Sequence, residues 1–256
     1  MTKAQENTNQ FTTEDQITKA PVQQSYLKNK YKFENLIISH SNKMAYTVAK
    51  NICDNEEIKY NPFIVVGSSG KSHLVQSIGN HLINNKLVIY TTAEQFLNYF
   101  TNHIRNNTMS SFREKYRTCD ILIIEDIQYL DNKEGTQEEL FFTIEDLLTN
   151  NKQIILTSNI HPNQMYSLNE RLLGRFVSGL IVEIKPYDMA TKIEIIKMKA
   201  KIHTVELTND IVGYIAISVN SNIYEIEGIV LKLKAYSQLM HAEIDMEFVK
   251  KLLVNK

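Results

Sequence analysis

The stretch that decides the fold is Phe63-Ile-Val-Val-Gly-Ser-Ser-Gly-Lys-Ser72, in which a short apolar run leads into a turn of glycine and serine. A second apolar run, Ile121-Leu-Ile-Ile-Glu-Asp126, ends in two acids. Backbone N–H groups and a lysine can hold phosphate groups after the first run, and carboxylates at a neighbouring strand end can hold Mg²⁺ and orient water. The two motifs together predict a nucleotide-binding α/β domain.

The phosphate-binding turn departs from the pattern G-x-x-x-x-G-K-[ST] that such turns follow. Counted back from Gly70, the first glycine of the pattern falls on Val65. A β-branched residue there would restrict the positive φ angles that a phosphate-binding turn uses. The alternative is a turn that has lost two residues. Either interpretation predicts weakened phosphate binding and inefficient hydrolysis.

The composition indicates a globular protein with no general attraction for nucleic acid. At 256 residues and 43% hydrophobic composition the chain can bury a full core, and its formal net charge of −1 creates no field that draws in duplex DNA. Cys53 and Cys119 lie far apart and are expected to be free thiols. The N-terminus is too polar for a signal peptide and no apolar run is long enough for a membrane span. We therefore expect a soluble, cytoplasmic protein.

Three regions follow from the pattern of apolar and polar residues: a disordered arm over 1–29, an α/β core over 30–186 and a helical lid over 187–256. Within the core, β-rich runs alternate with helical patterns, which predicts a parallel sheet covered on both faces. The expected strands are 63–66, 87–90, 121–124, 154–157 and 180–184, and the expected core helices lie near 43–53, 71–84, 93–105 and 136–149. A capping box of Thr136 and Glu139 marks the start of the last of these helices.

A series of segments in chain order resembles the bacterial chromosomal replication initiator family DnaA. These segments are Tyr31-Lys-Phe-Glu-Asn-Leu36, Gly70-Lys-Ser-His-Leu74, the run from Phe112 to Leu140, Leu156-Thr-Ser-Asn159, Arg171-Leu-Leu-Gly-Arg-Phe176 and Ser221-Asn-Ile-Tyr-Glu-Ile-Glu-Gly228. The resemblance implies an AAA+ P-loop NTPase core with a five-stranded parallel sheet, followed by a small all-α lid. It further implies ATP or ADP with Mg²⁺ as cofactors and assembly of subunits on the replication origin.

The resemblance also implies roles for individual residues in the nucleotide site. The phosphates would be bound by the turn and the start of the following helix, through Gly67, Ser68, Gly70, Lys71, Ser72 and His73. Ser72 and Asp126 would hold the metal. Glu125 and Asp126 would orient the attacking water, and Asn159 would sense the state of the nucleotide.

Four residues outside that site carry further implied roles. Arg175 matches the arginine finger that reaches the nucleotide of an adjacent subunit, and Arg171 is its partner at the interface. Leu97 and Lys133 match positions that touch single-stranded DNA. Of 28 basic residues only five are arginines, all between Arg105 and Arg175, and arginine in such a chain indicates positions that use a planar, multidentate donor.

Several positions depart from the family pattern besides Val65 and Ser68. The family has an aspartate where Glu125 and Asn159 stand, and an arginine in the lid where Tyr224 stands. A tyrosine cannot neutralise a phosphate, so coupling between ATP and lid movement should be weakened. Gly135 replaces a basic residue at the single-strand contacts.

Two function classes fit these observations, and a third is weaker. The first is an initiator-type ATPase that self-assembles on the origin. The second is a regulatory partner of a full-length DnaA-type initiator, similar to the short relative Hda, and the third is a truncated initiator remnant. The segment Gln23-Gln-Ser-Tyr-Leu27 only faintly resembles the sliding-clamp peptide of such a regulator. The family's helix-turn-helix has no counterpart after Lys256, so we expect no specific duplex DNA recognition and only weak single-stranded DNA contact through Lys133.

Overall fold

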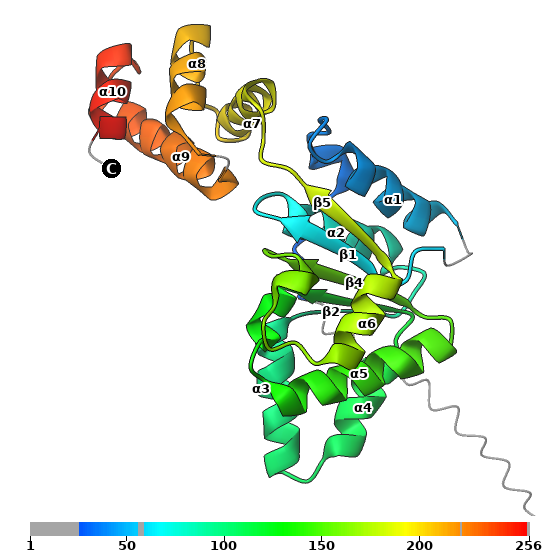
Figure 1. Ribbon diagram of the computed structural model, residues 1–256. Coiled ribbons are helices and arrows are strands. Elements are labelled where there is room, and N and C mark those ends of the chain that lie inside the picture. Colours follow the sequence, from blue (N-terminus) through cyan, green and yellow to red (C-terminus); the bar gives the residue numbers. More distant parts are fainter. Residues whose placement is uncertain (1–25, 56–58, 221, 255–256) are drawn as a thin grey trace, which may run out of the picture.

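A five-stranded parallel sheet forms the centre of the molecule (Figure 1). The computed structural model describes residues 26–55, 59–220 and 222–254. The strands are β1 (Phe63–Gly67), β2 (Val88–Thr92), β3 (Ile121–Glu125), β4 (Gln153–Ser158) and β5 (Leu180–Ile184). Their order across the sheet is β2-β3-β4-β1-β5, and every neighbouring pair is parallel. The predicted fold class is confirmed, and each expected strand is present within two residues of its expected bounds.

Helices cover both faces of the sheet, which explains why the strands are almost uninterrupted apolar runs. Side chains alternate between the faces along each strand. One face, which includes Val65 and Ile123, packs against α1 (Lys43–Asp54) and α2 (Lys71–Leu82). The other face packs against α3 (Ala93–Arg105), α4 (Met109–Arg117), α5 (Glu134–Thr149) and α6 (Glu170–Ser178). Short 3-10 helices occur at η1 (Phe33–Asn35), η2 (Ile127–Leu130) and η3 (Pro162–Gln164).

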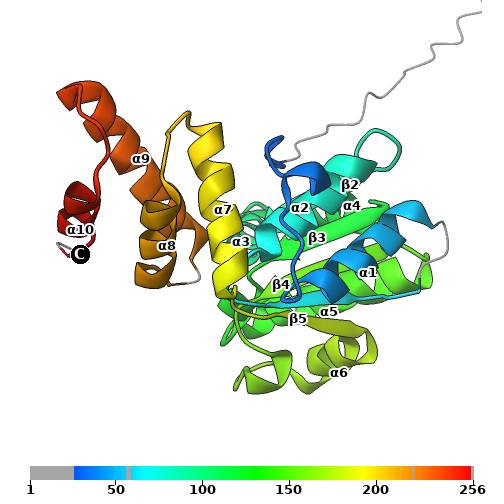
Figure 2. The same ribbon diagram turned by 90° about the horizontal axis from the view of Figure 1, so that it is seen from above.

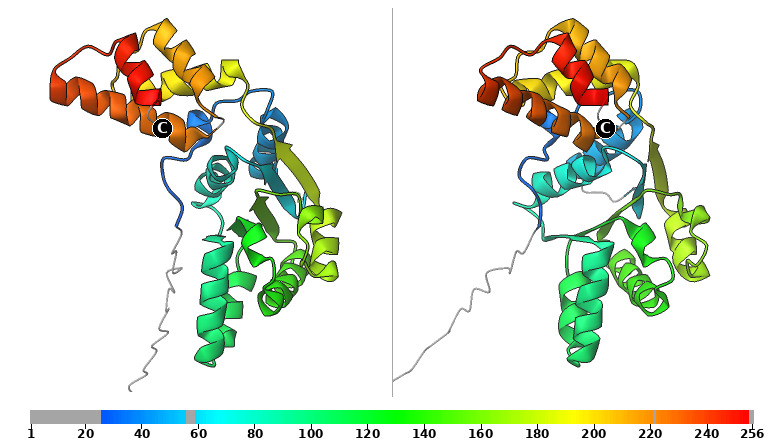
Figure 3. Two further views of the ribbon diagram at one scale, coloured as in Figure 1. Left: turned by 60° about the vertical axis from the view of Figure 1, so that its left-hand side comes forward. Right: turned by 90° about the vertical axis from the view of Figure 1, so that its left-hand side faces the viewer.

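The chain after β5 is helical throughout its described part. It forms α7 (Met189–Ile202), α8 (Asn209–Ser218), α9 (Ile223–Met240) and α10 (Met246–Val254). These helices bury an apolar cluster of their own, in which Ile196, Ile215 and Val230 are fully enclosed. Figures 2 and 3 show this group beside the sheet layers, at one end of the core. Within the described residues, no helix has the length and apolarity that crossing a bilayer requires.

Two helices and one helix start differ from the expectations. The helices α4 and α6 were not predicted. The prediction of a capping box at Thr136 and Glu139 is wrong. α5 begins at Glu134, and its N-cap residue Lys133 makes no side-chain capping hydrogen bond. The Glu139 carboxylate instead pairs with two arginines of α4.

The disordered arm stays a prediction, because residues 1–25 lie outside the described residues. The same holds for most of the segment that faintly resembles a clamp peptide. At the end of the expected arm, Leu27 packs on the apolar layer beside α2, and the Lys28 N–H donates to Gln76 Oε1 at 3.0 Å. The beginning of the described chain is thus tied to α2.

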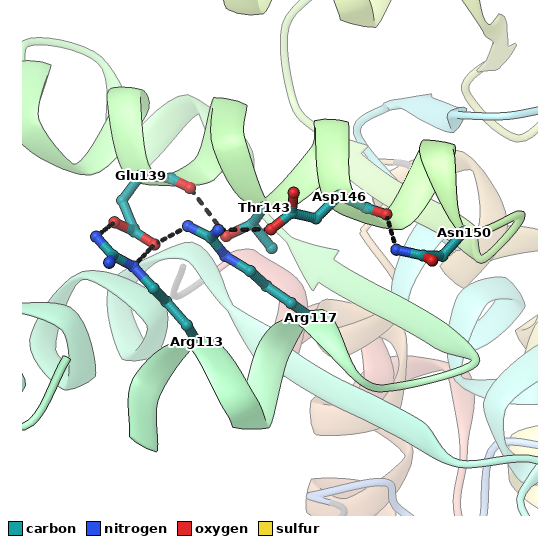
Figure 4. Close-up of polar contacts among 6 residues, drawn as sticks. All are labelled: Arg113, Arg117, Glu139, Thr143, Asp146 and Asn150. Atoms are coloured by element: carbon teal, nitrogen blue, oxygen red, sulfur yellow. Dashed lines mark hydrogen bonds and ion pairs between the residues drawn. The ribbon is translucent and has the colours of Figure 1, made fainter. Parts of the chain in front are cut away.

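Ion pairs join α4 to α5 beneath the sheet (Figure 4). Arg113 donates to both carboxylate oxygens of Glu139, at 3.3 and 3.2 Å, and Arg117 bridges Glu139 and Asp146. The Glu139 side chain is only 7% exposed, so its charge depends on these arginines for compensation. The pairing shows why two arginines occur together on α4.

Glu139→Gln should therefore destabilise the protein strongly. Removing one partner of a mostly buried ion pair leaves the other charge uncompensated, and we expect a loss of about 3 kcal/mol in the free energy of unfolding. Asp54→Asn removes the more exposed Lys50–Asp54 pair, and its cost should stay below about 1 kcal/mol. Urea unfolding followed by circular dichroism would measure both values. Equal losses in the two variants would contradict this role of Glu139.

Candidate nucleotide-binding site

The phosphate-binding turn is two residues shorter than the usual pattern. β1 ends at Gly67 and α2 begins at Lys71, so only Ser68, Ser69 and Gly70 lie between them. Val65 lies inside β1, where it is fully buried and pairs with Thr157 of β4. Val65 therefore does not occupy the position of the first glycine in the turn. The alternative is correct, in which the turn has lost two residues.

Gly67 and Gly70 are the glycines that the short turn requires. Their φ angles are 139° and 80°, which side chains other than glycine rarely adopt. A Cβ atom at Gly67 would lie 2.3 Å from the Ile184 carbonyl oxygen, and one at Gly70 would lie 2.7 Å from the Tyr187 hydroxyl. The turn keeps both glycines of the pattern and loses two of the residues between them.

Lys71 is held by its own turn and by the end of β4. Its Nζ donates to the Gly67 carbonyl oxygen at 2.6 Å and to Asn159 Oδ1 at 2.7 Å. The residue is only 6% exposed, and burial lowers the pKa of its ammonium group, while the nearby carboxylates of Asp126 and Glu125 oppose that shift. Asn159 thus holds the lysine through a neutral acceptor oxygen.

Glu125 lies in a buried cage of hydrogen-bond donors. Ser72 Oγ donates to its Oε2, and its Oε1 accepts from the Tyr90 hydroxyl at 2.7 Å and from Gln76 Nε2 at 3.1 Å. Burial, and next the charge of Glu125, raise the pKa of Tyr90, so that its hydroxyl stays a donor. The sequence analysis missed Tyr90 and Gln76, although Gln76 follows Ser72 by one helical turn and therefore shares its face of α2.

Asp126 lies beside this cage and is linked to Asn159. It adopts a left-handed conformation with φ 61°, and its N–H donates to Thr157 Oγ1 at 3.0 Å. Gln128 connects the two residues, because its Nε2 donates to Asp126 Oδ1 at 3.2 Å and its Oε1 accepts from the Asn159 N–H at 3.1 Å. Gln128, like Tyr90 and Gln76, was not predicted from the sequence.

The oxygen groups around Ser72 suit a magnesium ion. The expected metal ligands were Ser72 and Asp126, but the carboxylate in contact with Ser72 is that of Glu125. Mg²⁺ is usually bound by one or two carboxylates together with waters and substrate phosphates. The described residues contain no group of three or more His, Cys, Asp or Glu side chains that could hold a metal ion. Metal binding here would thus need phosphate oxygens to complete the ligand set.

A cavity of about 490 Å³ opens between the turn and the lid. Its polar lining includes Lys71, Asp126 and Asn159. Its aromatic walls include Tyr31 and His73, together with Tyr224 of α9, one of the C-terminal helices predicted to form the lid. The Tyr31 and His73 rings lie 5.1 Å apart. Burial, and next the neighbouring Tyr224, raise the pKa of Tyr31 to about 12, and burial lowers the pKa of His73. The Tyr31 and His73 rings are therefore uncharged at neutral pH, which suits stacking with a base.

The two interface arginines lie at a different place, between α5 and α6. Arg175 makes a double contact with Glu145, through Nε to Oε1 and through Nη2 to Oε2 at 2.8 Å. The Arg171 guanidinium lies over the Phe141 ring, 4.2 Å from its centroid. The four side chains and Gly174 line a groove that shares no lining residue with the nucleotide cavity. Glu145, the partner of Arg175 in this groove, was not predicted from the sequence.

The remaining predicted contacts, those for single-stranded DNA, lie on neighbouring elements. Leu97 is half-buried on α3 against the apolar core, and Lys133 is exposed directly before α5. α3 contacts η2, which precedes Lys133. Gly135 is exposed in the first turn of α5 and offers no charge.

Comparisons with known proteins agree with this architecture. The family model described as the bacterial DnaA ATPase domain matches residues 27–183. The chromosomal replication initiator protein DnaA of Sulfurimonas denitrificans is 50% identical over 234 residues, which cover 90% of this chain and 54% of that protein. The chain thus spans about half the length of the curated relatives it matches.

Solved structures give the same relationship. Domain III of the Thermotoga maritima initiator superposes with a TM-score of 0.84 at 34% identity, covering 90% of this chain and 97% of that one. A DnaA structure with bound AMPPCP and single-stranded DNA superposes with a TM-score of 0.77 at 37% identity, covering 82% and 66%. With the family model matching more than half of its residues, this chain belongs to the bacterial DnaA family of AAA+ replication initiator ATPase domains.

Proposed function

We propose that this chain binds an adenine nucleotide weakly and acts in replication initiation by offering Arg175 to the nucleotide of a neighbouring DnaA-type subunit. The observation that carries the proposal is a contrast between two sites. Arg171 and Arg175 are kept on an accessible groove, whereas the chain's own phosphate-binding turn is shortened and Tyr224 stands at the lid position of the family's sensing arginine. Such a chain is better suited to donate an arginine than to receive one.

The chain's own cavity suits a nucleotide that is held with fewer phosphate contacts. Lys71 and the N-terminus of α2 would hold the phosphates, Ser72 with Glu125 and Asp126 would hold Mg²⁺, and the aromatic walls would take the base. Two fewer turn residues mean fewer backbone N–H donors, and a hydrogen bond to a charged group contributes about 1.5–3 kcal/mol. When bound, Mg²⁺ would supply charge neutralisation at the phosphate oxygens.

The alternative candidate is an initiator-type role in which copies of this chain assemble with one another and contact single-stranded DNA. It is favoured by Lys133, which is exposed between α5 and the short helix η2 that contacts α3, and by the relative whose structure contains single-stranded DNA. The two roles differ in the partner of Arg175, which is a full-length initiator in the first and a second copy in the second. A truncated remnant would have neither partner.

Nucleotide binding tests the cavity directly. ATP and ADP should both bind, at least tenfold more weakly than to the Thermotoga maritima domain measured in parallel, because the loss of one N–H contact already corresponds to about that factor. Lys71→Ala should abolish binding, and Lys43→Ala, an exposed lysine of α1, should leave it unchanged. Calorimetry measures all of these. Absence of heat at millimolar nucleotide, or equal affinity in Lys71→Ala, would remove the site from the proposal.

Mixing experiments test the action on a neighbour. With the ATP-loaded full-length initiator of Sulfurimonas denitrificans, the wild-type chain should change ATP turnover or assembly, and Arg175→Ala should not. An arginine finger supplied from outside contributes up to about 10³ to 10⁵ in rate. Arg105→Ala, an exposed arginine at the end of α3, is the matched control and should behave as wild type. If neither the wild type nor the variants altered the initiator, the proposed function would lose its support.

A further inference from the structure

The groove between α5 and α6 contains a negative charge beside the arginine that is to meet phosphate. Phe141 and Glu145 are four residues apart on α5, and Arg171 and Arg175 are four residues apart on α6, so each pair lies on one face of its helix. Arg171 therefore meets a ring and Arg175 meets a carboxylate. The two arginines differ in what must be displaced before a ligand binds.

We propose that Glu145 is a competing anion that holds Arg175 against α5 and must be displaced before the arginine can contact a phosphate group. This role rests on the proposed function, in which Arg175 meets the nucleotide of a neighbouring subunit. Glu145 is a positioning residue, since it acts only through Arg175. While Glu145 is paired with Arg175, only an anion with more negative charge than a carboxylate can displace it and bind the arginine.

The double contact fixes the guanidinium in one orientation. Both Nε and Nη2 face Glu145, and these are the donors that a planar fork offers to a phosphate. A phosphate group cannot use that edge of Arg175 while the carboxylate occupies it. Engagement is therefore an exchange of one anion for another.

The pair is poorly placed for a purely structural role. The side chains of Arg175 and Glu145 are 43% and 31% exposed, whereas those of Arg117 and Glu139 are 19% and 7% exposed. Exposed pairs contribute little to stability. They still compete with a ligand, because a phosphate must break the pair and also approach the Glu145 charge.

The exchange selects by charge. A single carboxylate from a partner gains nothing over Glu145, because it replaces one negative charge with another of the same size. The terminal phosphate of a nucleotide carries more negative charge and more acceptor oxygens, so it gains more from the guanidinium. Arg175 should thus ignore acidic surface residues of a partner and respond to its bound nucleotide.

The experiment follows Arg175 itself, without a partner. The chain has only five arginines, so labelling with ¹⁵N-arginine gives five Nε–H signals, which single Arg→Lys variants assign. The probe is inorganic tripolyphosphate, titrated into wild type, Glu145→Gln and Glu138→Gln. Glu138 is exposed on the same helix, about 10 Å before Glu145 at 1.5 Å per residue, and its substitution makes the same change in net charge.

The concentration of tripolyphosphate that half-saturates the Arg175 signal should fall about three- to tenfold in Glu145→Gln and stay at the wild-type value in Glu138→Gln. Acetate, as a single carboxylate, should not shift the Arg175 signal of the wild type. The Nε–H of Arg175 should also exchange with solvent faster in Glu145→Gln. Equal titrations in the wild type and Glu145→Gln, or no shift at Arg175 in either, would overturn the role of Glu145.

A second arm separates this role from the proposed function. Added to the ATP-loaded initiator of Sulfurimonas denitrificans, Glu145→Gln should act at a lower concentration than wild type or Glu138→Gln. If the tripolyphosphate results are as expected but no variant affects the initiator, competition by Glu145 stands and the proposed function fails. If the initiator responds equally to all three proteins, the proposed function stands and the role of Glu145 is wrong.

Discussion

Ion pairs and ring contacts to α5 hold four of the five arginines of the chain, and two of these contacts form the groove proposed to act on a neighbouring subunit. Glu139 and Asp146 face the arginines of α4, while Phe141 and Glu145 face those of α6. α5 is therefore held on one side by ion pairs around the buried Glu139 carboxylate and presents an accessible groove on the other. The Arg175–Glu145 pair shares no residue with these contacts, so its opening would leave Glu139 paired.

The nucleotide site depends on the parallel register of the sheet. β1 lies between β4 and β5, and β3 pairs with β4, so the short turn, the acids of β3 and Asn159 meet at one edge. The turn has lost two residues without losing its glycines, because both glycine positions are enforced by close contacts with the end of β5 and with Tyr187. The shorter turn therefore offers fewer backbone N–H groups to a phosphate, but Lys71 stays in place and donates to Asn159.

The sequence predicted the fold well wherever a local pattern was sufficient. The five apolar strands and the family itself could both be inferred from short runs of sequence. The sequence motif was counted with a fixed spacing, which assumes a loop of standard length and assigns Val65 to the first glycine position. Val65 in fact lies inside β1, where it pairs with Thr157 of β4, so the loop is shorter than that spacing assumes. The predicted capping box is absent because the Glu139 carboxylate pairs with Arg117 and Arg113 of α4, which precede it by 22 and 26 residues in sequence. Glu145, Tyr90 and Gln128 could not be found because their partners are brought close only by the fold.

The departures from the family pattern are not equal in their consequences. The extra methylene of Glu125 is accommodated, because Ser72, Tyr90 and Gln76 donate to its two oxygens, and Gln76 also accepts from the Lys28 N–H, which ties the cage to the N-terminal segment. The neutral side-chain oxygen of Asn159 still accepts a hydrogen bond from the Lys71 ammonium group. Tyr224 has no such compensation, because a hydroxyl cannot supply the charge of an arginine to a phosphate. In the proposed function, the residues that would position a nucleotide are thus largely present, whereas Tyr224 lines the cavity at the place where a charged side chain would be needed to bind the terminal phosphate. Since Arg175 lies outside that cavity, its proposed action on a neighbouring subunit would not depend on Tyr224.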